Sequence, residues 1–330
     1  MEKQNITIYD VANKAGVSMA TVSRVINNSS RVREDTKAKV LKIINDLNYR
    51  PNVVAKGLAS KRTTTVGVIT PDLINSYFSE LAKGIDDVSL MYNYNIILAS
   101  SDKDEKKTIK VINNLLAKQI DGLILIGDQL SDNASSLLKS SKVPVVLAGA
   151  LDDYFPTVNI DYEKAVYEVI VRFIKENRKK IAFVGNLDNY IDKKLRLNGY
   201  KKALNENNIK FDNQLVFDSY YESYDFGYET SKKIKELDLD AVYAANDDVA
   251  VGILNGLLDL DKSVPSDIAI VTSNNTKITN MIRPKLGSII QPLYDLGAVS
   301  MRLLTKLIDN ETFDEKNVVL PHNFKSRQTG

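Results

Sequence analysis

Cysteine is absent from the 330-residue chain, so neither a disulfide framework nor a thiolate metal site can form. Histidine occurs once, at His322, and a histidine metal cluster or a Ser–His triad would have to be built on that residue alone. No apolar run approaches membrane-spanning length, and the first residues lack the apolar core of a signal peptide. We therefore expect a cytoplasmic protein with no membrane partner.

Motifs of nucleotide-binding and hydrolytic enzymes are also missing. The sequence has no glycine-rich dinucleotide motif, no Walker A motif and no nucleophile elbow. Three acidic pairs occur, Asp86–Asp87, Asp152–Asp153 and Asp247–Asp248. Neighbouring residues do not share a helix face, and most such pairs are simply solvated. We expect no enzyme activity, no metal and no cofactor.

Charge is distributed unevenly along a chain whose formal net charge is only +2. Residues 1–63 hold 12 Lys and Arg against 5 Asp and Glu, whereas the remaining residues hold 32 against 37. The N-terminal segment therefore concentrates the field that attracts phosphates.

Residues 7–27, TIYDVANKAGVSMATVSRVIN, have the pattern of a helix-turn-helix. Thr7 can begin a first helix, Gly16 can form the turn, and Ser18 can begin a second helix. The side chains of the second helix that point outward are Met19, Ala20, Ser23 and Arg24. A short helix presented in this way fits the DNA major groove, where Arg24 suits guanine and Ala20 suits a thymine methyl. The alternative interpretation is an ordinary helical hairpin.

A third helix is predicted at about 33–47, where apolar residues at helical spacing can close a three-helix core. Pro51 ends this pattern, and residues 52–60 form a helix candidate too short to be stable alone in water. Leu58 in this segment is an exposed apolar side chain of the type that enters the minor groove. Folding coupled to DNA binding is one interpretation of the segment, and a plain linker is the other.

From residue 65 onward, short apolar runs alternate with amphipathic helical stretches. Continuous Val, Ile and Leu runs joined by helices predict parallel sheets covered on both faces. The predicted strands are 65–70, 94–99, 121–126, 143–148, 180–185, 240–245, 267–272 and 287–291. The predicted helices include 79–91, 106–118, 163–176, 196–206, 249–259 and 294–306.

The helix-turn-helix and the following YRPNVVAKGLAS resemble the LacI-type bacterial transcription repressors, and the likeness covers essentially the whole chain. The resemblance implies an α/β protein in which an N-terminal three-helix helix-turn-helix module and a hinge helix precede a two-lobed periplasmic-binding-protein-like domain with parallel sheets. We expect a headpiece at 1–50, a hinge at 51–63 and a two-lobed domain at 64–330. The chain would cross between the lobes near residues 161, 291 and 320.

The resemblance also implies a homodimer on a palindromic double-stranded DNA operator. The expected DNA-binding residues are Thr7, Tyr9, Ser18, Met19, Ala20, Thr21, Ser23, Arg24, Asn27, Arg50, Asn52, Ala55 and Leu58. A solute-binding or carbohydrate-processing protein is the alternative from another class, and the N-terminal helices argue against it.

The cleft between the lobes is the expected effector site. Relatives that respond to sugars and purines hold the effector with an arginine, and the match here is Arg196. Asn246 and Asp247 match a further family motif, although capping of the following helix is the favoured role. Asn274 stands where the family usually has an acid that grips the ligand, which weakens the case for a tightly held sugar. The departure leaves room for a weakly bound or phosphorylated metabolite.

Residues 57–72 and 289–307 look like a subgroup of the family that acts in carbon catabolite control. In that subgroup a serine-phosphorylated, histidine-containing phosphocarrier protein binds as corepressor. The residues that match its binding surface are Asp72, Asp87, Tyr92, Tyr294, Asp295, Val299, Arg302 and Lys306. Arg302 and Lys306 lie one helical turn apart and could receive a phosphate. The alternative is a repressor of the same fold that a small sugar releases from DNA.

Overall fold

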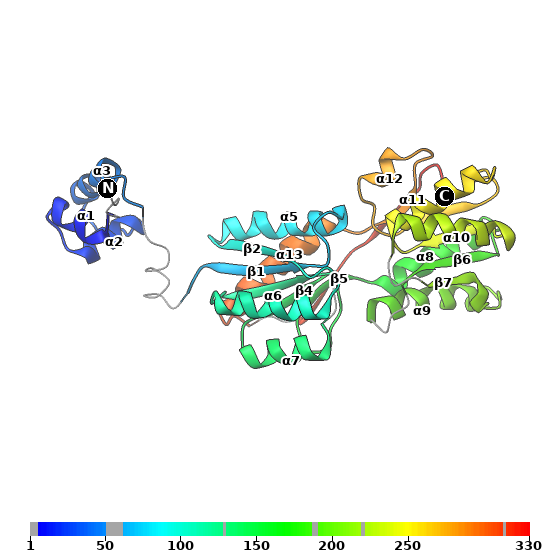
Figure 1. The fold of residues 1–330 in the computed structure, drawn as a ribbon, viewed down its shortest axis with the longest axis horizontal. Coiled ribbons are helices and arrows are strands. Elements are labelled where there is room, and N and C mark those ends of the chain that lie inside the picture. The colour runs from blue at the N-terminus through cyan, green and yellow to red at the C-terminus, as the bar shows by residue number, and fades with distance from the viewer. Residues whose placement is uncertain (1–5, 51–61, 128–129, 187–190, 219–221, 313–314) are drawn as a thin grey trace. The chain divides into compact units, whose positions relative to one another are not determined.

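The computed structural model describes residues 6–50, 62–127, 130–186, 191–218, 222–312 and 315–330. The chain divides into two compact units, Met1–Thr63 and Thr64–Gly330 (Figure 1). Across these described ranges, no helix is both long and apolar enough to cross a membrane.

Within its described residues, 6–50 and 62–63, the first unit is a three-helix module, as predicted. Its helices are α1 (Ile8–Ala15), α2 (Met19–Ile26) and α3 (Glu34–Asp46). The backbone N–H and the hydroxyl of Thr7 both donate to Asp10 Oδ2, at 2.8 and 2.7 Å, and so fix the start of α1. Gly16 ends α1 with a φ of 63°, a left-handed conformation that glycine adopts without strain. The buried core residues of the module are Val11, Ala12, Ala15, Val22, Val25, Val40 and Ile43.

The second unit contains two six-stranded sheets, one in each lobe. The first has the order β11-β5-β4-β3-β1-β2, with all its strands parallel. Its strands are β1 (Thr65–Thr70), β2 (Asn95–Ser100), β3 (Gly122–Ile126), β4 (Val145–Ala148), β5 (Thr157–Ile160) and β11 (Asn317–Leu320).

The second sheet has the order β12-β10-β9-β8-β6-β7 and is parallel except for its antiparallel edge strand β12. Its strands are β6 (Ile181–Gly185), β7 (Val216–Asp218), β8 (Ala241–Ala244), β9 (Ala269–Thr272), β10 (Gly287–Ile290) and β12 (Asn323–Lys325). The predicted parallel sheets are confirmed, and the antiparallel strand is an addition.

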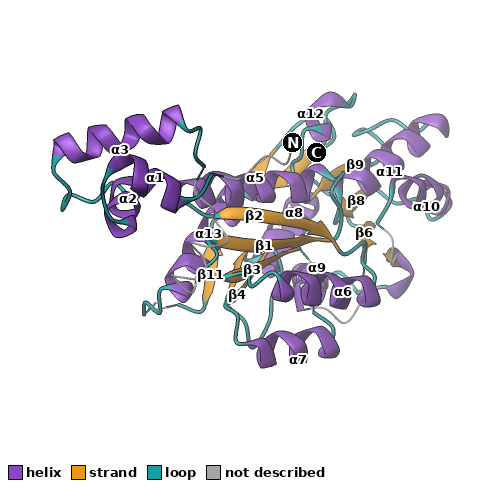
Figure 2. Ribbon diagram, turned by 60° about the vertical axis from the view of Figure 1, so that its left-hand side comes forward, coloured by secondary structure: helices purple, strands orange, loops and turns teal. Residues whose placement is uncertain are grey.

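Helices cover both faces of each sheet (Figure 2). Since side chains alternate between the two faces along every strand, each strand packs against helices on both sides. In β3, Ile124 and Ile126 join the core under α5 (Ser76–Met91) and α13 (Leu293–Ile308). Leu123 and Leu125 join the opposite core, under α6 (Glu105–Ala117) and α7 (Asp132–Ser141). A continuous apolar run is therefore what this doubly covered strand requires.

The second lobe repeats this arrangement. Phe183 and Tyr243 pack toward α8 (Tyr162–Lys175) and α9 (Ile191–Glu206). Val184 and Val242 pack toward α10 (Tyr224–Glu236) and α11 (Asp247–Asp259). The short elements η1 (Asn213–Leu215) and α12 (Ile278–Met281) complete the lobe.

The chain passes between the lobes three times. After Ile160 it leaves the first sheet and enters α8 of the second lobe. After Ile290 it leaves the second sheet for α13, which packs against β3, β4 and β5 of the first. After Leu320 it returns to the second sheet as β12.

All eight predicted strands are present, most of them with ends shifted by one or two residues. The sequence did not predict β5, β7, β11 and β12, which are three or four residues long and mix polar with apolar side chains. The helix predicted from residue 196 is longer in the structure, where α9 spans Ile191–Glu206. The prediction missed its first turn because that turn is mostly polar and carries little helical periodicity.

Candidate functional site

The second helix of the small unit presents an exposed face with its start fixed by a cap. Ser18 Oγ accepts a hydrogen bond from the backbone N–H of Thr21 at 3.2 Å. Val22 and Val25 point into the module core. Burial of these two valines forces the opposite face of α2, which carries Ala20 and Arg24, into solvent.

The other residues expected to bind DNA surround this face or lie outside the described residues. Those that are exposed are Thr7, Tyr9, Ser18, Met19, Ala20, Arg24, Asn27 and Arg50, whereas Thr21 and Ser23 are half-buried. Tyr9 is 61% exposed. Asn52, Ala55 and Leu58 lie outside the described residues.

A groove of about 280 Å³ runs between α5 and α13 on the first lobe. Val88 and Ala298 are buried in its floor, and Met91 and Tyr294 are exposed at its edge. Asp295, Val299 and Arg302, which share one stripe of α13, also line it. The groove therefore combines an apolar floor with charges of both signs.

Arg302 and Lys306 are exposed on successive turns of α13. Within the described parts of the chain, neither side chain forms an ion pair or a hydrogen bond with another side chain. Two cations one turn apart and without a carboxylate partner can receive a doubly charged anion.

The lining of the groove does not include Asp87, Tyr92 and Asp72, which are also expected on the corepressor surface. Asp87, on α5, accepts the Tyr294 hydroxyl at 3.2 Å and pairs with Lys83. Tyr92 is exposed at the C-terminal end of α5. Asp72 is absent from the lining of the groove and instead lines a larger cavity between the lobes.

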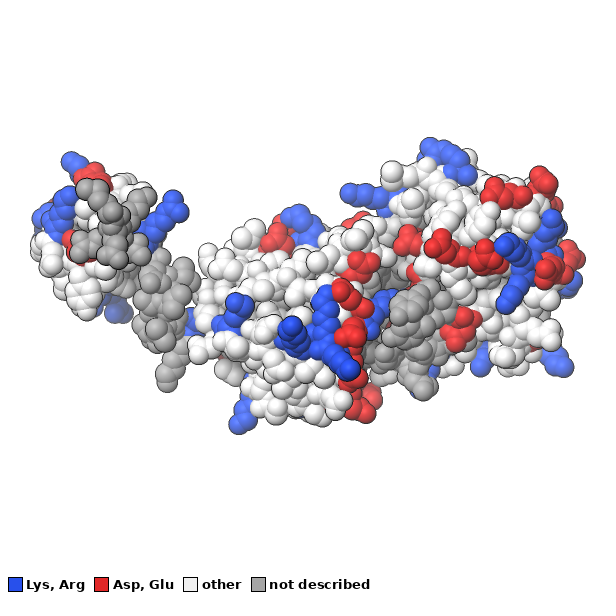
Figure 3. Space-filling view, in the orientation of Figure 1, with Lys and Arg blue, Asp and Glu red and all other residues white. Residues whose placement is uncertain are grey.

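This interlobe cavity has a volume of about 590 Å³ and is strongly charged. Figure 3 shows acidic and basic side chains gathered along the boundary of the two lobes. Among the described residues, the charged side chains that line the cavity are Asp72, Glu105, Asp192, Glu222, Asp248, Lys103 and Lys193. Carboxylates outnumber ammonium groups in this described lining, which disfavours a phosphorylated anion.

One ion pair in the cavity is largely buried. Lys193 Nζ lies 3.8 Å from Glu222 Oε2, and the two side chains are only 23% and 12% exposed. Burial raises the pKa of Glu222, but the Lys193 charge, the Asn186 N–H and the charges of Arg196 and Lys103 together lower it more, so the net pKa lies below its usual value. Burial lowers the pKa of Lys193, but Glu222 and Asp192 raise it more. Both groups are therefore held in their charged forms.

Residues 7–52 match the bacterial regulatory proteins of the lacI family, and residues 170–329 match the periplasmic binding protein-like domain. Catabolite control protein A of Streptococcus mutans is 49% identical to this chain over 327 residues, which cover 98% of each chain. The chain belongs to the lacI family.

Further members of the lacI family support the same assignment. Catabolite control protein A of Priestia megaterium is 45% identical over 330 residues, covering 98% of this chain and 99% of the relative. The crystal structure of the transcription regulator CcpA of Lactococcus lactis has a TM-score of 0.79 at 42% identity and covers 81% of this chain and 99% of that chain. The lac repressor dimer bound to operator has a TM-score of 0.88 at 27% identity, covering 99% of both chains.

This lacI-family protein is therefore a DNA-binding transcription regulator in catabolite control, and its relatives are regulators rather than enzymes. The single histidine fits this assignment. His322 Nε2 lies 3.1 Å from Glu168 Oε2 in the crossover from β11 to β12, where its side chain is 9% exposed. We interpret this contact as structural.

Of the four residues expected in the effector cleft, only Asn246 lines the cavity. Its side chain also caps α11 by accepting the N–H of Asp248 at 2.8 Å. Arg196 is buried beside the cavity, where its guanidinium donates to Ser273 Oγ at 2.6 Å and stacks 4.4 Å from the centre of the Tyr162 ring. In this member of the lacI family, Arg196 is already engaged by protein groups.

Asp247 and Asn274 are likewise engaged inside the second lobe. Asp247 is 2% exposed and accepts hydrogen bonds from the hydroxyls and backbone groups of Thr272, Asn274 and Thr276. Asn274 Oδ1 accepts the side-chain amide of Gln291 at 3.0 Å. Asp247 therefore joins α11 to the loop after β9, and the side chain of Asn274 joins that loop to Gln291 at the end of β10.

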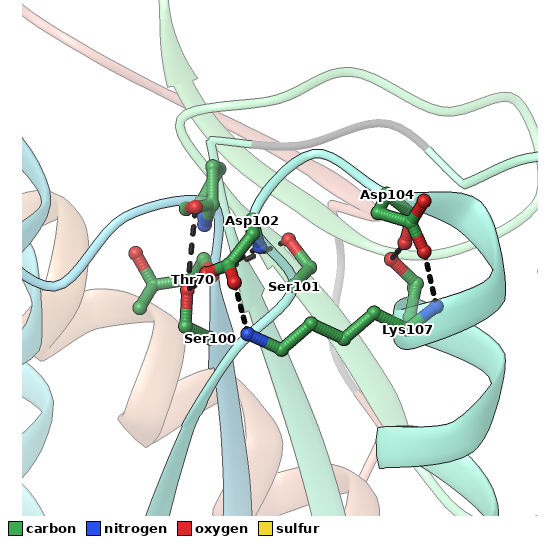
Figure 4. A network of polar contacts seen from close by, with 8 residues as sticks. Thr70, Ser100, Ser101, Asp102, Asp104 and Lys107 are labelled. Atoms are coloured by element: carbon green, nitrogen blue, oxygen red, sulfur yellow. Dashed lines mark hydrogen bonds and ion pairs between the residues drawn. The ribbon is translucent and has the colours of Figure 1, made fainter.

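The sequence did not predict most of the charged residues that line the cavity. Lys103 reaches it from a turn after β2 in which Asp102 and Lys103 both have positive φ. Hydrogen bonds of Asp102 with Ser100 and Lys107 hold this turn (Figure 4). The sequence signal of Lys103 is the SDKDEKK run at 101–107, which is indistinguishable from a solvated loop.

Proposed function

We propose that the protein binds a palindromic operator as a homodimer together with a serine-phosphorylated, histidine-containing phosphocarrier protein as corepressor. The observation that carries this proposal is the exposed pair Arg302 and Lys306 beside the groove between α5 and α13. Both relatives named catabolite control protein A align with nearly the whole chain, which includes this helix.

A phosphoserine suits this pair because it carries about −1.5 to −2 charges near neutral pH and three acceptor oxygens. A guanidinium and an ammonium one turn apart can donate to two of those oxygens at once. The apolar floor of the groove would then bury a nonpolar side chain of the carrier. Asp295 lies on the same stripe nearly two turns earlier and would meet a histidine or another basic group.

Operator binding and carrier binding would be coupled. In this proposal the carrier binds the first lobe and prefers one arrangement of the two lobes. That arrangement would favour the form of the dimer that binds the operator with its two hinge segments side by side. By linkage, operator DNA then tightens carrier binding by the same factor by which the carrier tightens DNA binding.

The experiment is a titration of phosphorylated and unphosphorylated carrier, each with and without operator DNA. We expect the phosphorylated form to bind more tightly, and the variant Arg302→Ala/Lys306→Ala to lose this preference. Each charge-assisted hydrogen bond contributes about 1.5–3 kcal/mol before desolvation costs. The matched control is Lys106→Ala/Lys110→Ala, which removes two exposed cations one turn apart on α6 of the same lobe. Equal binding of both carrier forms, or normal binding by the Arg302/Lys306 variant, would refute the proposal.

A repressor released by a small molecule is the second candidate. The interlobe cavity favours it, because about 590 Å³ lies within the usual range for ligand pockets. The same titration separates the two candidates. Under this alternative, a sugar changes the affinity for operator DNA, and the phosphorylated carrier leaves that affinity unchanged.

A further inference from the structure

A further pocket of the first lobe, the edge pocket, opens at the edge of the sheet where its strands begin. Its volume is about 410 Å³, and its walls are the end of α7 and the segments that precede β4, β5 and β11. Because these strands are parallel, their beginnings share one edge of the sheet. The interlobe cavity lies at the other edge, where Asp72 and Gly127 follow β1 and β3. Among the described residues, the edge pocket shares no lining side chain with this cavity or with the groove between α5 and α13.

The floor of the edge pocket is apolar. Leu138 of α7, Val145 of β4 and Phe155 before β5 are buried in it. Half-buried apolar residues extend this floor, namely Val143, Pro144, Pro156 and Leu307. An apolar side chain that enters such a hollow leaves water, and this transfer is the main favourable contribution to most protein association.

Three exposed lysines, Lys139, Lys142 and Lys316, surround the opening of the pocket. Lys316 also donates to the backbone carbonyl of Asp153 at 2.7 Å. Within the parts of the chain that the structure describes, none of the three lysines forms an ion pair with a carboxylate. The apolar floor is therefore ringed by positive charge that the described residues do not neutralise.

Tyr154 stands at the opening and is 55% exposed. Its ring packs edge-on against Phe155, with the ring centres 4.9 Å apart, and Asp152 Oδ1 accepts the backbone N–H groups of both residues. Lys139 Nζ and Lys316 Nζ lie over the Tyr154 ring, 4.5 and 5.6 Å from its centre. These ammonium groups cover the ring surface on which a nucleic acid base would stack, so the arrangement favours a protein segment over a nucleic acid.

We propose that the edge pocket docks an acidic segment of a partner protein, with an apolar side chain in the floor and flanking carboxylates paired with the lysines. Charge complementarity selects this occupant, because ammonium groups without acidic partners attract carboxylates and repel a basic surface. Contacts to a nucleic acid backbone need cations and hydrogen-bond donors but no apolar floor. A two-fold contact with a second copy of this chain would place lysines against lysines. The proposal does not rest on the corepressor function of the groove between α5 and α13.

The first test uses the absence of tryptophan from the chain, since Tyr154→Trp in the full-length protein supplies a single fluorophore at the opening. The probe is a tryptophan-free synthetic peptide with a central leucine between aspartates and glutamates. A comparison peptide has serine in place of the leucine. We expect the leucine peptide to shift the emission to shorter wavelength, because the indole leaves water, and to bind at least about tenfold more tightly than the serine peptide.

Tyr92→Trp is the matched control for this measurement. Tyr92 is 48% exposed on the same lobe, at the C-terminal end of α5 and outside the edge pocket. Its replacement should show no change in emission when the leucine peptide is added. Absence of binding, equal binding of the two peptides, or a shift only in the Tyr92→Trp protein would refute the proposal.

The second test removes the charge and keeps the native tyrosine. With a fluorescein-labelled leucine peptide, Lys139→Gln/Lys316→Gln should weaken binding about tenfold and flatten its dependence on salt. The control Lys106→Gln/Lys110→Gln removes two exposed cations from α6 of the same lobe and should leave binding nearly unchanged. Tyr154→Phe, which keeps the ring, should bind the peptide better than Tyr154→Ala. Wild-type affinity of the Lys139/Lys316 variant, or an equal loss in the control, would show that the edge pocket is not the docking site.

The same variants distinguish the other occupants. If Lys139→Gln/Lys316→Gln weakens binding of duplex DNA of scrambled sequence and leaves peptide binding unchanged, the lysines contact nucleic acid and the proposal is wrong. If sedimentation shows a changed oligomeric state for this variant, the pocket is a contact between copies of the chain, which also overturns the proposal. Failure of the wild-type protein to bind phosphorylated carrier would refute the proposed corepressor function alone.

Discussion

The contact between α5 and α13 predicts a specific effect of Gly84→Ala. The added methyl carbon would lie 2.0 Å from the carbonyl oxygen of Tyr294 and 2.9 Å from the nitrogen of Ala298. Both neighbours are backbone atoms, so no side-chain rotation can relieve the clash. Because ordinary contact begins at 3.4 Å, the two helices must separate by about 1.4 Å.

The change in the free energy of unfolding caused by Gly84→Ala follows from two opposing effects. Overpacking of a core contact costs about 1–3 kcal/mol. Exchange of glycine for alanine inside a helix stabilises it by about 0.5–1 kcal/mol. We therefore expect Gly84→Ala to lower the free energy of unfolding by about 1–2 kcal/mol. Because Tyr294 itself must move, the affinity for the phosphorylated carrier should fall by about tenfold, which corresponds to about 1.4 kcal/mol.

The assay combines urea denaturation with carrier titration, and Gly199→Ala is the matched control. A methyl on Gly199 would lie 2.2 Å from the carbonyl oxygen of Glu163, a similar clash between α8 and α9 of the other lobe. Both variants should be less stable than wild type, but only Gly84→Ala should weaken carrier binding. Equal carrier affinity of the two variants, or a Gly84→Ala protein as stable as wild type, would refute the reasoning.

Two further predictions concern the other candidate sites. Arg24→Ala should reduce discrimination between operator and scrambled DNA by about 1–3 kcal/mol in a binding assay at fixed salt, and unchanged discrimination would remove Arg24 from base recognition. Lys193→Met should destabilise the second unit by about 3 kcal/mol near neutral pH, because it leaves Glu222 charged and largely buried. The Glu222–Lys193 ion pair contributes to the free energy of unfolding only within a pH window, because the pKa of Glu222 is lowered and the pKa of Lys193 is raised. The contribution is complete between about pH 4.3 and 10.4, fades as Glu222 gains its proton below this window and fades as Lys193 loses its proton above it. Denaturation of wild type and variant across this range checks the prediction, and a pH-independent difference would contradict it.

The DNA-binding module could be predicted from the sequence because every feature that defines it is local. The caps at Thr7 and Ser18 lie beside the helices they begin, and the left-handed turn at Gly16 lies between them. The inward valines of α2 repeat within a single helix. The exposed stripe on α13 was predictable for the same reason, since helical spacing alone brings Arg302 and Lys306 to one face.

The longer strands were also determined locally. Strands buried on both faces need an uninterrupted apolar run, and β1 matches its predicted range of 65–70. Short strands such as β5 and β12 carry no such signal. They become strands because a neighbour offers its unpaired backbone groups, as β10 does for β12.

Only the tertiary structure decided which polar residues act together. Asp87 and Tyr294 are separated by 207 positions in the sequence, and they meet because two glycines let α5 and α13 touch. Lys103 and Glu222 come from different lobes to line one cavity. Asp247 looked like a candidate ligand contact, yet the loop after β9 engages it from inside the lobe. A local pattern can give the face on which a side chain lies, but its partners depend on long-range contacts that no local pattern encodes.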